Sequence, residues 1–161
     1  MRRKLLVLAV ALAAAFAVSA SAAAATLTFT SPFSSETQTF LVDANGNGEL
    51  EPGDTIRVSG VLLNTVPQFD RPAGALVGSW VAEVTFDSDG LLHVRGLFTY
   101  PRFGRILAGG AIDPATTEPQ QRFHARGFSG SINTFGTLDV IDTLDSSIFT
   151  FTFPWEHDPI R

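Results

Sequence analysis

The sequence predicts an all-β fold, a small antiparallel barrel of eight strands, and three observations support that prediction. Polar and apolar residues alternate along most segments after residue 25, which is typical of half-buried strands. Gly, Pro, Asn and Asp separate these segments at short intervals, as turns do. No segment after residue 25 keeps the i, i+3, i+4, i+7 apolar spacing of an amphipathic helix over three turns.

The expected strands follow one another from end to end. The first, 26–30, reads Thr-Leu-Thr-Phe-Thr, and the last, 148–153, puts its three Phe on one face and its Thr on the other. Asp89-Gly90 lies between two apolar runs and is the clearest hairpin signal. The Pro- and Thr-rich stretch 113–121 is expected to be an exposed loop. The intervening strands are expected at 38–42, 55–64, 76–86, 91–100, 105–112, 122–128 and 137–141.

Glycines inside the expected strands bear on the choice between a barrel and a sandwich. Gly60, Gly78, Gly96 and the pair Gly109-Gly110 all fall within strand segments. Glycine weakens a strand unless a bend or a close backbone contact requires it, and barrel corners need such bends. The glycines therefore favour the barrel. The alternative is an immunoglobulin-like β-sandwich, whose strands also carry glycine.

Residues 1–25 have the order of a secretory signal peptide. Arg2, Arg3 and Lys4 precede an apolar run over 5–18, and only small residues follow over 19–25. The run is shorter than the roughly 20 residues that a membrane-spanning helix needs. We expect cleavage before Thr26 and no membrane association afterwards. The protein is then secreted, either extracellular or periplasmic, with a single domain over 26–161.

Composition and charge exclude several classes of partner. Lys and Arg number 11 against 16 Asp and Glu, a net charge of -5. Nucleic acids and anionic membrane surfaces are bound by clustered cations, so neither is an expected partner. With no Cys, the chain has no disulfide, thiolate metal site or Cys nucleophile. The 14 Phe among 45% hydrophobic residues indicate a folded core.

The segment 43–54 resembles an EF-hand calcium loop, in the dockerin variant that Asp closes. Oxygen-bearing residues occupy positions 1, 3, 5 and 12, and Gly48 at position 6 permits the sharp turn. The resemblance implies a structural calcium ion, held at about 0.1–1 mM because two early ligands are neutral. The alternative is a polar turn without an ion. The expected ligands are the side chains of Asp43, Asn45, Asn47 and Asp54 and the backbone carbonyl of Glu49.

From residue 55 onward the order of motifs is similar to the barrel shared by allene oxide cyclases and dirigent proteins. Gly53-Asp54 opens a strand, 78–86 is a long strand, and 89–96 reads as a hairpin that ends in Gly. Gly-rich strands follow at 108–111 and 127–130. The resemblance implies an apolar interior that binds a small hydrophobic molecule and steers its cyclisation or coupling. No residue here matches the family's acid/base residues, so the sequence leaves catalysis, as an isomerase or cyclase, undecided.

The segment 43–56 also resembles the first residues of bacterial cell-surface β-sandwich repeats, and this chain has one copy of it. That second resemblance implies a non-catalytic, calcium-stabilised extracellular or cell-surface module.

Strand parity gives the candidate site residues. In a barrel, large apolar side chains of one parity would line the lumen and hold the ligand. On the opposite parity, polar residues of two neighbouring strands would meet at the ligand if they faced inward. If they face solvent instead, they would form surface ion pairs that stabilise the fold by about 0–1 kcal/mol. The expected ligand-binding residues are Trp80, Phe86, Phe98, Phe149 and Phe151, and the catalytic candidates are Glu83, His93 and Arg95.

Overall fold

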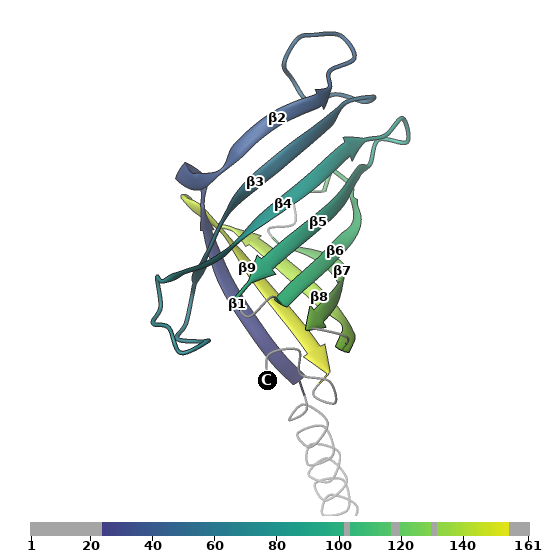
Figure 1. Cartoon of the computed structure of the whole chain (residues 1–161). Helices are drawn as coiled ribbons and strands as arrows, with labels where there is room; N and C mark the ends of the chain where they lie inside the picture. Colours follow the sequence, from purple (N-terminus) through teal and green to yellow (C-terminus); the bar gives the residue numbers. More distant parts are fainter. Residues whose placement is uncertain (1–23, 102–103, 117–119, 130–131, 155–161) are drawn as a thin grey trace, which may run out of the picture.

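The computed structural model describes residues 24–101, 104–116, 120–129 and 132–154. These residues form nine strands and one short 3-10 turn, η1 (Phe33–Ser35). Within them, no helix is long and apolar enough to cross a membrane. In Figure 1 the strands are β1 (Ala24–Pro32), β2 (Thr37–Val42), β3 (Thr55–Asn64), β4 (Leu76–Phe86), β5 (Leu92–Tyr100), β6 (Gly104–Ile112), β7 (Gln120–Ser129), β8 (Ile132–Asp142) and β9 (Ser146–Pro154).

The strands close into an antiparallel barrel, which confirms the predicted fold class. Neighbours run in the order β1-β9-β8-β7-β6-β5-β4-β3, and β1 then pairs with β3. Only the registers Phe29↔Asn64 and Thr30↔Leu63 join β1 to β3, whereas β1 pairs with β9 from Ala24 to Pro32. One continuous sheet of eight strands thus encloses the core, and the sandwich alternative is excluded.

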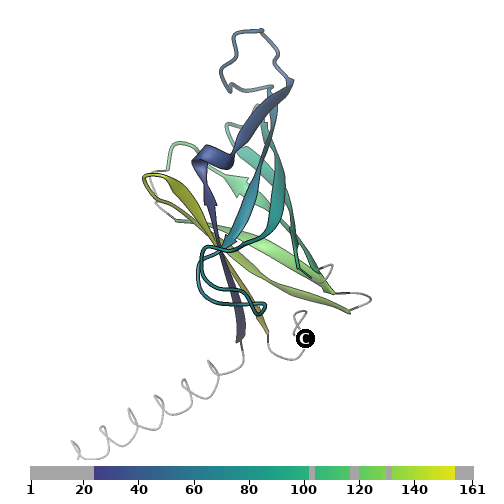
Figure 2. The ribbon, with the colours of Figure 1, turned by 60° about the vertical axis from the view of Figure 1, so that its left-hand side comes forward.

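The ninth strand, β2, shares an edge of β3 with β1. After β1, the η1 turn breaks the pairing, and β2 continues along the first half of β3, from Thr37↔Ser59 to Val42↔Thr55. β2 and the loop after it stand above the rest of the wall in both views (Figures 1 and 2). We call this end of the barrel, with the turns 87–91 and 143–145, the upper end. The end with Ala24 and Pro154 is the lower end.

The observed strands match the predicted segments and are longer at several ends. β8 begins at Ile132 rather than at residue 137, because its first residues pair with the end of β7. Most of the predicted signal peptide lies outside the described residues. The expected cleavage position before Thr26 falls inside β1, where Ala24 and Ala25 pair with Pro154 and Phe153.

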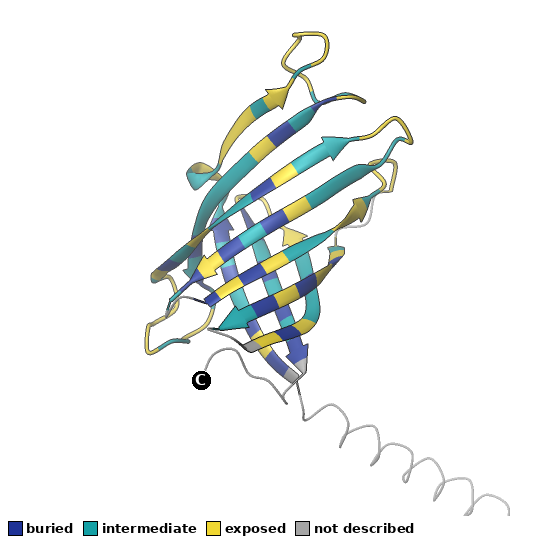
Figure 3. Cartoon of the chain, turned by 45° about the vertical axis from the view of Figure 1, so that its right-hand side comes forward, coloured by how far each residue is buried: buried dark blue, intermediate teal, exposed yellow. Residues whose placement is uncertain are grey.

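Alternating burial along the strands of the barrel separates an inner face from an outer one, whereas β2 is exposed along nearly its whole length (Figure 3). The lower half of the interior is packed with rings. Phe29 and Phe151 are fully buried with centroids 6.1 Å apart, and Phe151 lies 4.9 Å from Phe98. Phe69, in the loop 65–75, stacks at 5.5 Å on Tyr100 and covers this packing from below. The lower half is therefore a solid aromatic core.

Hydrogen bonds fix the loop 65–75 to the lower end of the barrel. The Asn64 side chain is buried, and its Nδ2 donates to the carbonyl oxygen of Gln68 at 2.9 Å. Gln68 Nε2 in turn donates to the carbonyl oxygen of Thr28 on β1 at 2.7 Å. Phe69 and Asp70 have φ of 55° and 56°, in the left-handed region that residues other than Gly rarely adopt. The surrounding hydrogen bonds hold this backbone and so keep the Phe69 ring in the core.

Candidate functional site

The upper half of the barrel contains a cavity of about 220 Å³. Of its fifteen lining residues, thirteen are apolar or Gly, and the other two are Asp142 and Ser147. The space exists because the inward positions at this level carry small side chains, such as Ala82, Gly96 and Ala108. An apolar cavity of this kind suits a small hydrophobic molecule.

Three aromatic rings form the cavity's inner end. Trp80 lies 5.4 Å from Phe149 and 6.2 Å from Phe98, measured between ring centroids. Phe98 and Phe149 meet edge to face at 5.1 Å. These are favourable aromatic geometries, worth about 0.5–1.5 kcal/mol per pair beyond burial. The same cluster contacts the packed lower core through Phe98 and Phe151, so the cavity ends where the solid core begins.

A chain of hydrogen bonds connects this cluster to a carboxyl group. Trp80 Nε1 donates to Ser31 Oγ at 2.9 Å, and Ser31 Oγ donates to Glu36 Oε1 at 3.2 Å. Ser31 is fully buried at the end of β1, and Glu36 follows the η1 turn. A Cβ at Gly60 would lie 2.7 Å from Trp80 Nε1 and 2.8 Å from Ser31 Oγ. Only glycine at this position of β3 leaves room for the hydrogen bonds that join Trp80, Ser31 and Glu36.

A second carboxyl group lines the cavity near its open end, which we call the mouth. Asp142, at the end of β8, lines the cavity and is exposed to solvent, and its Oδ1 accepts a hydrogen bond from Ser147 Oγ at 2.6 Å. Burial raises the pKa of Glu36, the Ser31 hydrogen bond opposes that rise, and the negative charge of Asp142 adds to it. The environment of Glu36 therefore favours its protonated form more than free solution does.

The predicted ligand-binding residues take three different places. Trp80, Phe98 and Phe149 line the cavity. Phe151 is fully buried below it, in the solid core. Phe86 lies at the upper end of β4, outside the lining, where its backbone exchanges hydrogen bonds with the end of the loop 43–54.

The predicted catalytic candidates are on the outer face. Glu83 Oε1 forms an ion pair with Arg57 at 2.7 Å, both side chains being about half exposed at 50% and 51%. Arg95 is the register partner of Glu83 on β5, and the three line a shallow outer groove. Glu83, His93 and Arg95 therefore do not meet at the cavity, and they follow the surface arrangement that the sequence left open.

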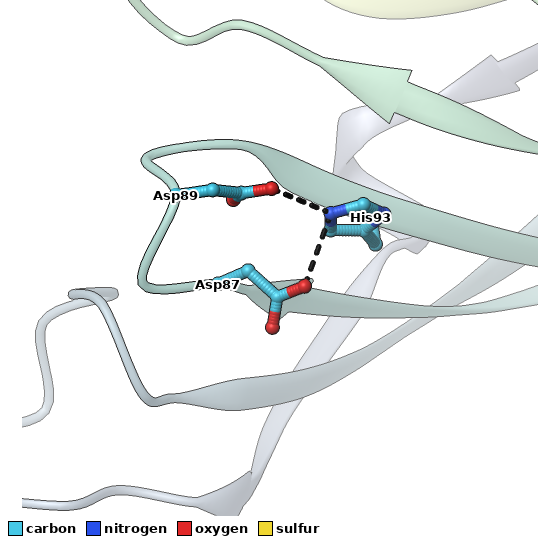
Figure 4. A group of neighbouring side chains, drawn as sticks. All are labelled: Asp87, Asp89 and His93. Carbon is cyan, nitrogen blue, oxygen red and sulfur yellow. Dashed lines mark ion pairs between the residues drawn. The ribbon is translucent and has the colours of Figure 1, made fainter.

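His93 instead approaches two carboxylates of the β4–β5 hairpin (Figure 4). Its Nε2 lies 3.1 Å from Asp87 Oδ2 and 3.6 Å from Asp89 Oδ2. In the described part of the chain, this is the one group of three His, Asp or Glu whose ligand atoms lie within 4.8 Å of one another. One imidazole and two carboxylates form a donor set that suits a divalent ion such as zinc, and a plain ion pair uses the same atoms.

The loop 43–54 folds back on itself through its predicted ligands. The Asp43 carboxylate accepts from the N–H groups of Gly46 and Gly48 at 2.6 and 3.0 Å. Asp54, which is buried, accepts from Ala44 and Glu51 at 2.7 and 2.8 Å. Carboxylate oxygens keep lone pairs beyond these bonds, so the donor chemistry fits calcium. The remaining expected ligands are Asn45 and Asn47, whose Oδ1 atoms accept backbone hydrogen bonds, and Glu49, which is exposed.

Sequence reasoning missed the polar residues of the mouth. Ser31 has the parity of Leu27 and Phe29, and Asp142 has the parity of Leu138 and Val140. Continuing the alternation one step beyond each apolar run would have pointed to both. Glu36 follows a turn, where no periodicity applies.

Comparison with known proteins gives the fold and no closer relationship. No protein-family model matches the chain, and no curated protein sequence matches it. Among solved structures, it resembles a Diels–Alderase from Streptomyces koyangensis, with a TM-score of 0.60, 19% identity, and coverage of 81% of this chain and 67% of that one.

Two further structures have the same architecture. A nonspecific heme-binding cyclase that catalyses a [4 + 2] cycloaddition in neoabyssomicin biosynthesis has a TM-score of 0.59 and 16% identity, and the match covers 84% of this chain and 65% of that one. A pterocarpan synthase dirigent protein has a TM-score of 0.58 and 15% identity, with coverage of 84% and 87%. The chain therefore shares its barrel fold with cyclase, Diels–Alderase and dirigent proteins.

Proposed function

We propose that the protein binds a small apolar molecule in the upper cavity and steers its cyclisation or isomerisation. The observation that carries this proposal is the cavity itself, apolar along its walls, closed by aromatic rings below, and lined by a carboxylate at its mouth. The fold neighbours include cyclases, which adds support by analogy only.

The chemistry follows from the surroundings of a bound molecule. Apolar walls hold a flexible substrate in one compact conformation and keep water away from it. At the mouth, Asp142 removes a proton from one substrate atom and returns it to another. The substrate is isomerised without net loss of a proton. A positioned acid or base of this type accelerates a reaction by about 10²–10⁴.

The test uses N-phenyl-1-naphthylamine, a neutral apolar dye that fluoresces in apolar surroundings. We expect saturable binding with one dye per protein. Ala108→Phe, which fills the cavity, abolishes this binding, whereas Leu107→Ala, on the outer face of the same strand, leaves it unchanged. Unsaturable binding, or equal binding by Ala108→Phe, contradicts the proposal.

Export and calcium binding belong to the same proposal. The order of charge, apolar run and small residues over 2–25 supports secretion. N-terminal sequencing of protein from the medium tests it, with an expected start near Thr26, and an intact Met1 in the membrane fraction contradicts it. The oxygen spacing of the loop 43–54 supports a structural calcium ion. An ion bound there would also serve a non-catalytic extracellular module, the alternative function.

A further inference from the structure

The charge of the cavity mouth is unbalanced. Among the described residues, the cavity lining includes no Lys, Arg or His, and Asp142 is its one ionisable member. Glu36 is not a lining residue, but Ser31, its hydrogen-bond partner, lies opposite Ser147 in the β1–β9 register, and Ser147 lines the cavity and bonds Asp142. The hydrogen-bond partners of these two carboxyl groups are the neutral hydroxyls of Ser31 and Ser147. A ligand that enters the apolar space therefore meets negative groups at its outer end, with no cation in the lining to neutralise them.

We propose that the ligand is a monocation, with an apolar body inside the cavity and one amine-like positive group at the mouth between Asp142 and Glu36. This inference rests on the proposed function, because it takes the cavity as the binding site, and it adds the chemical class of the ligand.

Mutual repulsion of the two carboxyl groups supports this choice. The charge of Asp142 reaches Glu36 strongly enough to contribute to its raised pKa. A positive group between them replaces that repulsion by two attractions, whereas a neutral ligand leaves it in place and an anionic ligand adds to it.

A bound cation also acts on the pKa of Glu36. A nearby positive charge lowers the pKa of a carboxyl group, so it opposes the rise that burial causes in Glu36. Among the described residues, Asp142 on β8 is the charged group that acts on Glu36, and Ser31 on β1 acts through a hydrogen bond. Trp80 on β4 and Gly60 on β3 complete the surroundings and carry no charge.

Three probes of one shape test the inference. 1-Naphthylmethylamine is cationic at neutral pH, 1-naphthylmethanol is neutral and 1-naphthoate is anionic, and each competes with N-phenyl-1-naphthylamine. We expect the amine to bind about tenfold more tightly than the alcohol, and the naphthoate most weakly. The preference decreases as salt is added, because the mouth is open to solvent.

Variants locate the effect. Asp142→Asn and Glu36→Gln each reduce the preference for the amine and keep the affinity for the alcohol. Glu83→Gln makes the same change of charge on the outer wall and keeps the preference. Alcohol binding without a preference for the amine overturns the inference and leaves the proposed function standing. A preference that survives both mouth variants also overturns it. If none of the three probes binds, the proposed function fails, and the inference fails with it.

Discussion

The lower and upper halves of the barrel have the same strands and the same alternation, yet one is solid and the other is hollow. In the lower half, inward positions carry large rings such as Phe29, Tyr100 and Phe151. In the upper half, the same face of the neighbouring strands carries Ala82 and Ala108. An eight-stranded barrel has room for either side chains or one small ligand. The size of each inward residue, rather than the strand geometry, therefore decides where the cavity lies.

The sharpest way to break this comparison is to remove a ring from the solid half. Phe151→Ala deletes a fully buried side chain and is expected to lower the free energy of unfolding by about 3–5 kcal/mol. Urea unfolding measures the loss. Leu144→Ala, at a fully exposed turn residue, serves as the control and should change stability by less than about 0.5 kcal/mol. A loss below about 1 kcal/mol for Phe151→Ala would show that the lower half is not tightly packed.

A matched pair of enlargements compares the cavity wall with the packed core on neighbouring strands. Ala108 and Ala125 are register partners on β6 and β7, but Ala108 lines the cavity whereas Ala125 is 4% exposed within the packed core. Ala125→Leu is expected to lower stability by about 1–3 kcal/mol through overpacking. Ala108→Leu has space to occupy, so it should change stability less and weaken the binding of the neutral dye. Equal losses of stability for the two variants would contradict the comparison.

The loops beyond the two ends are expected to differ in what fixes them. Protein hydrogen bonds hold the lower loop 65–75, whereas we predict that calcium adds to the upper loop 43–54. At ten times the dissociation constant, the ion stabilises the native state by about 1.4 kcal/mol, which raises the melting temperature by roughly 3–6 °C. Melts in calcium and in chelator measure the difference, and Asp43→Ala should abolish it. Identical melts of the unmodified protein would refute the site.

The smallest expected effect is the pH dependence of the mouth. Burial raises the pKa of Glu36 above its value of 4.5 in the unfolded chain, so the native state keeps a proton that the unfolded state loses. Stability should therefore fall as pH rises from about 4.5 through the native pKa, and Glu36→Gln should flatten this fall. Urea midpoints across this range provide the measurement.

Asp139 gives a control of opposite sign. A hydrogen bond from Arg122 is the main cause that lowers the pKa of Asp139 below 3.8. Its contribution to stability is present above that value and is lost as pH falls through the native pKa. Asp139→Asn should thus lower the free energy of unfolding at neutral pH, whereas Glu36→Gln should not.

The sequence could predict the strands and the barrel because alternation and turn residues are local signals. Parity also grouped Trp80, Phe98 and Phe149, which line the cavity. Parity does not give depth along the barrel axis. A prediction from parity alone therefore puts Phe86 and Phe151 in the cavity lining, although Phe86 lies above the cavity and Phe151 below it. Nor does parity show which face points inward, which left the position of Glu83 open. Glu36 depends on a turn that redirects the chain between β1 and β2, and its approach to Asp142 is a property of the closed barrel.

The pairing of β1 with β9 has a consequence for how the protein folds. Leu27 lies opposite Phe151, so this pairing joins the two ends of the folded sequence, whereas β3 to β9 pair with their neighbours through local turns. Contacts of such long sequence separation make folding slow, on the order of milliseconds to seconds. The ligand cavity is enclosed only when this pair of strands is joined, so a binding site in the upper half depends on contacts between strands from opposite ends of the fold. Without β1, the Phe row of β9 lacks one neighbouring strand, and exposed apolar surface of this kind favours aggregation.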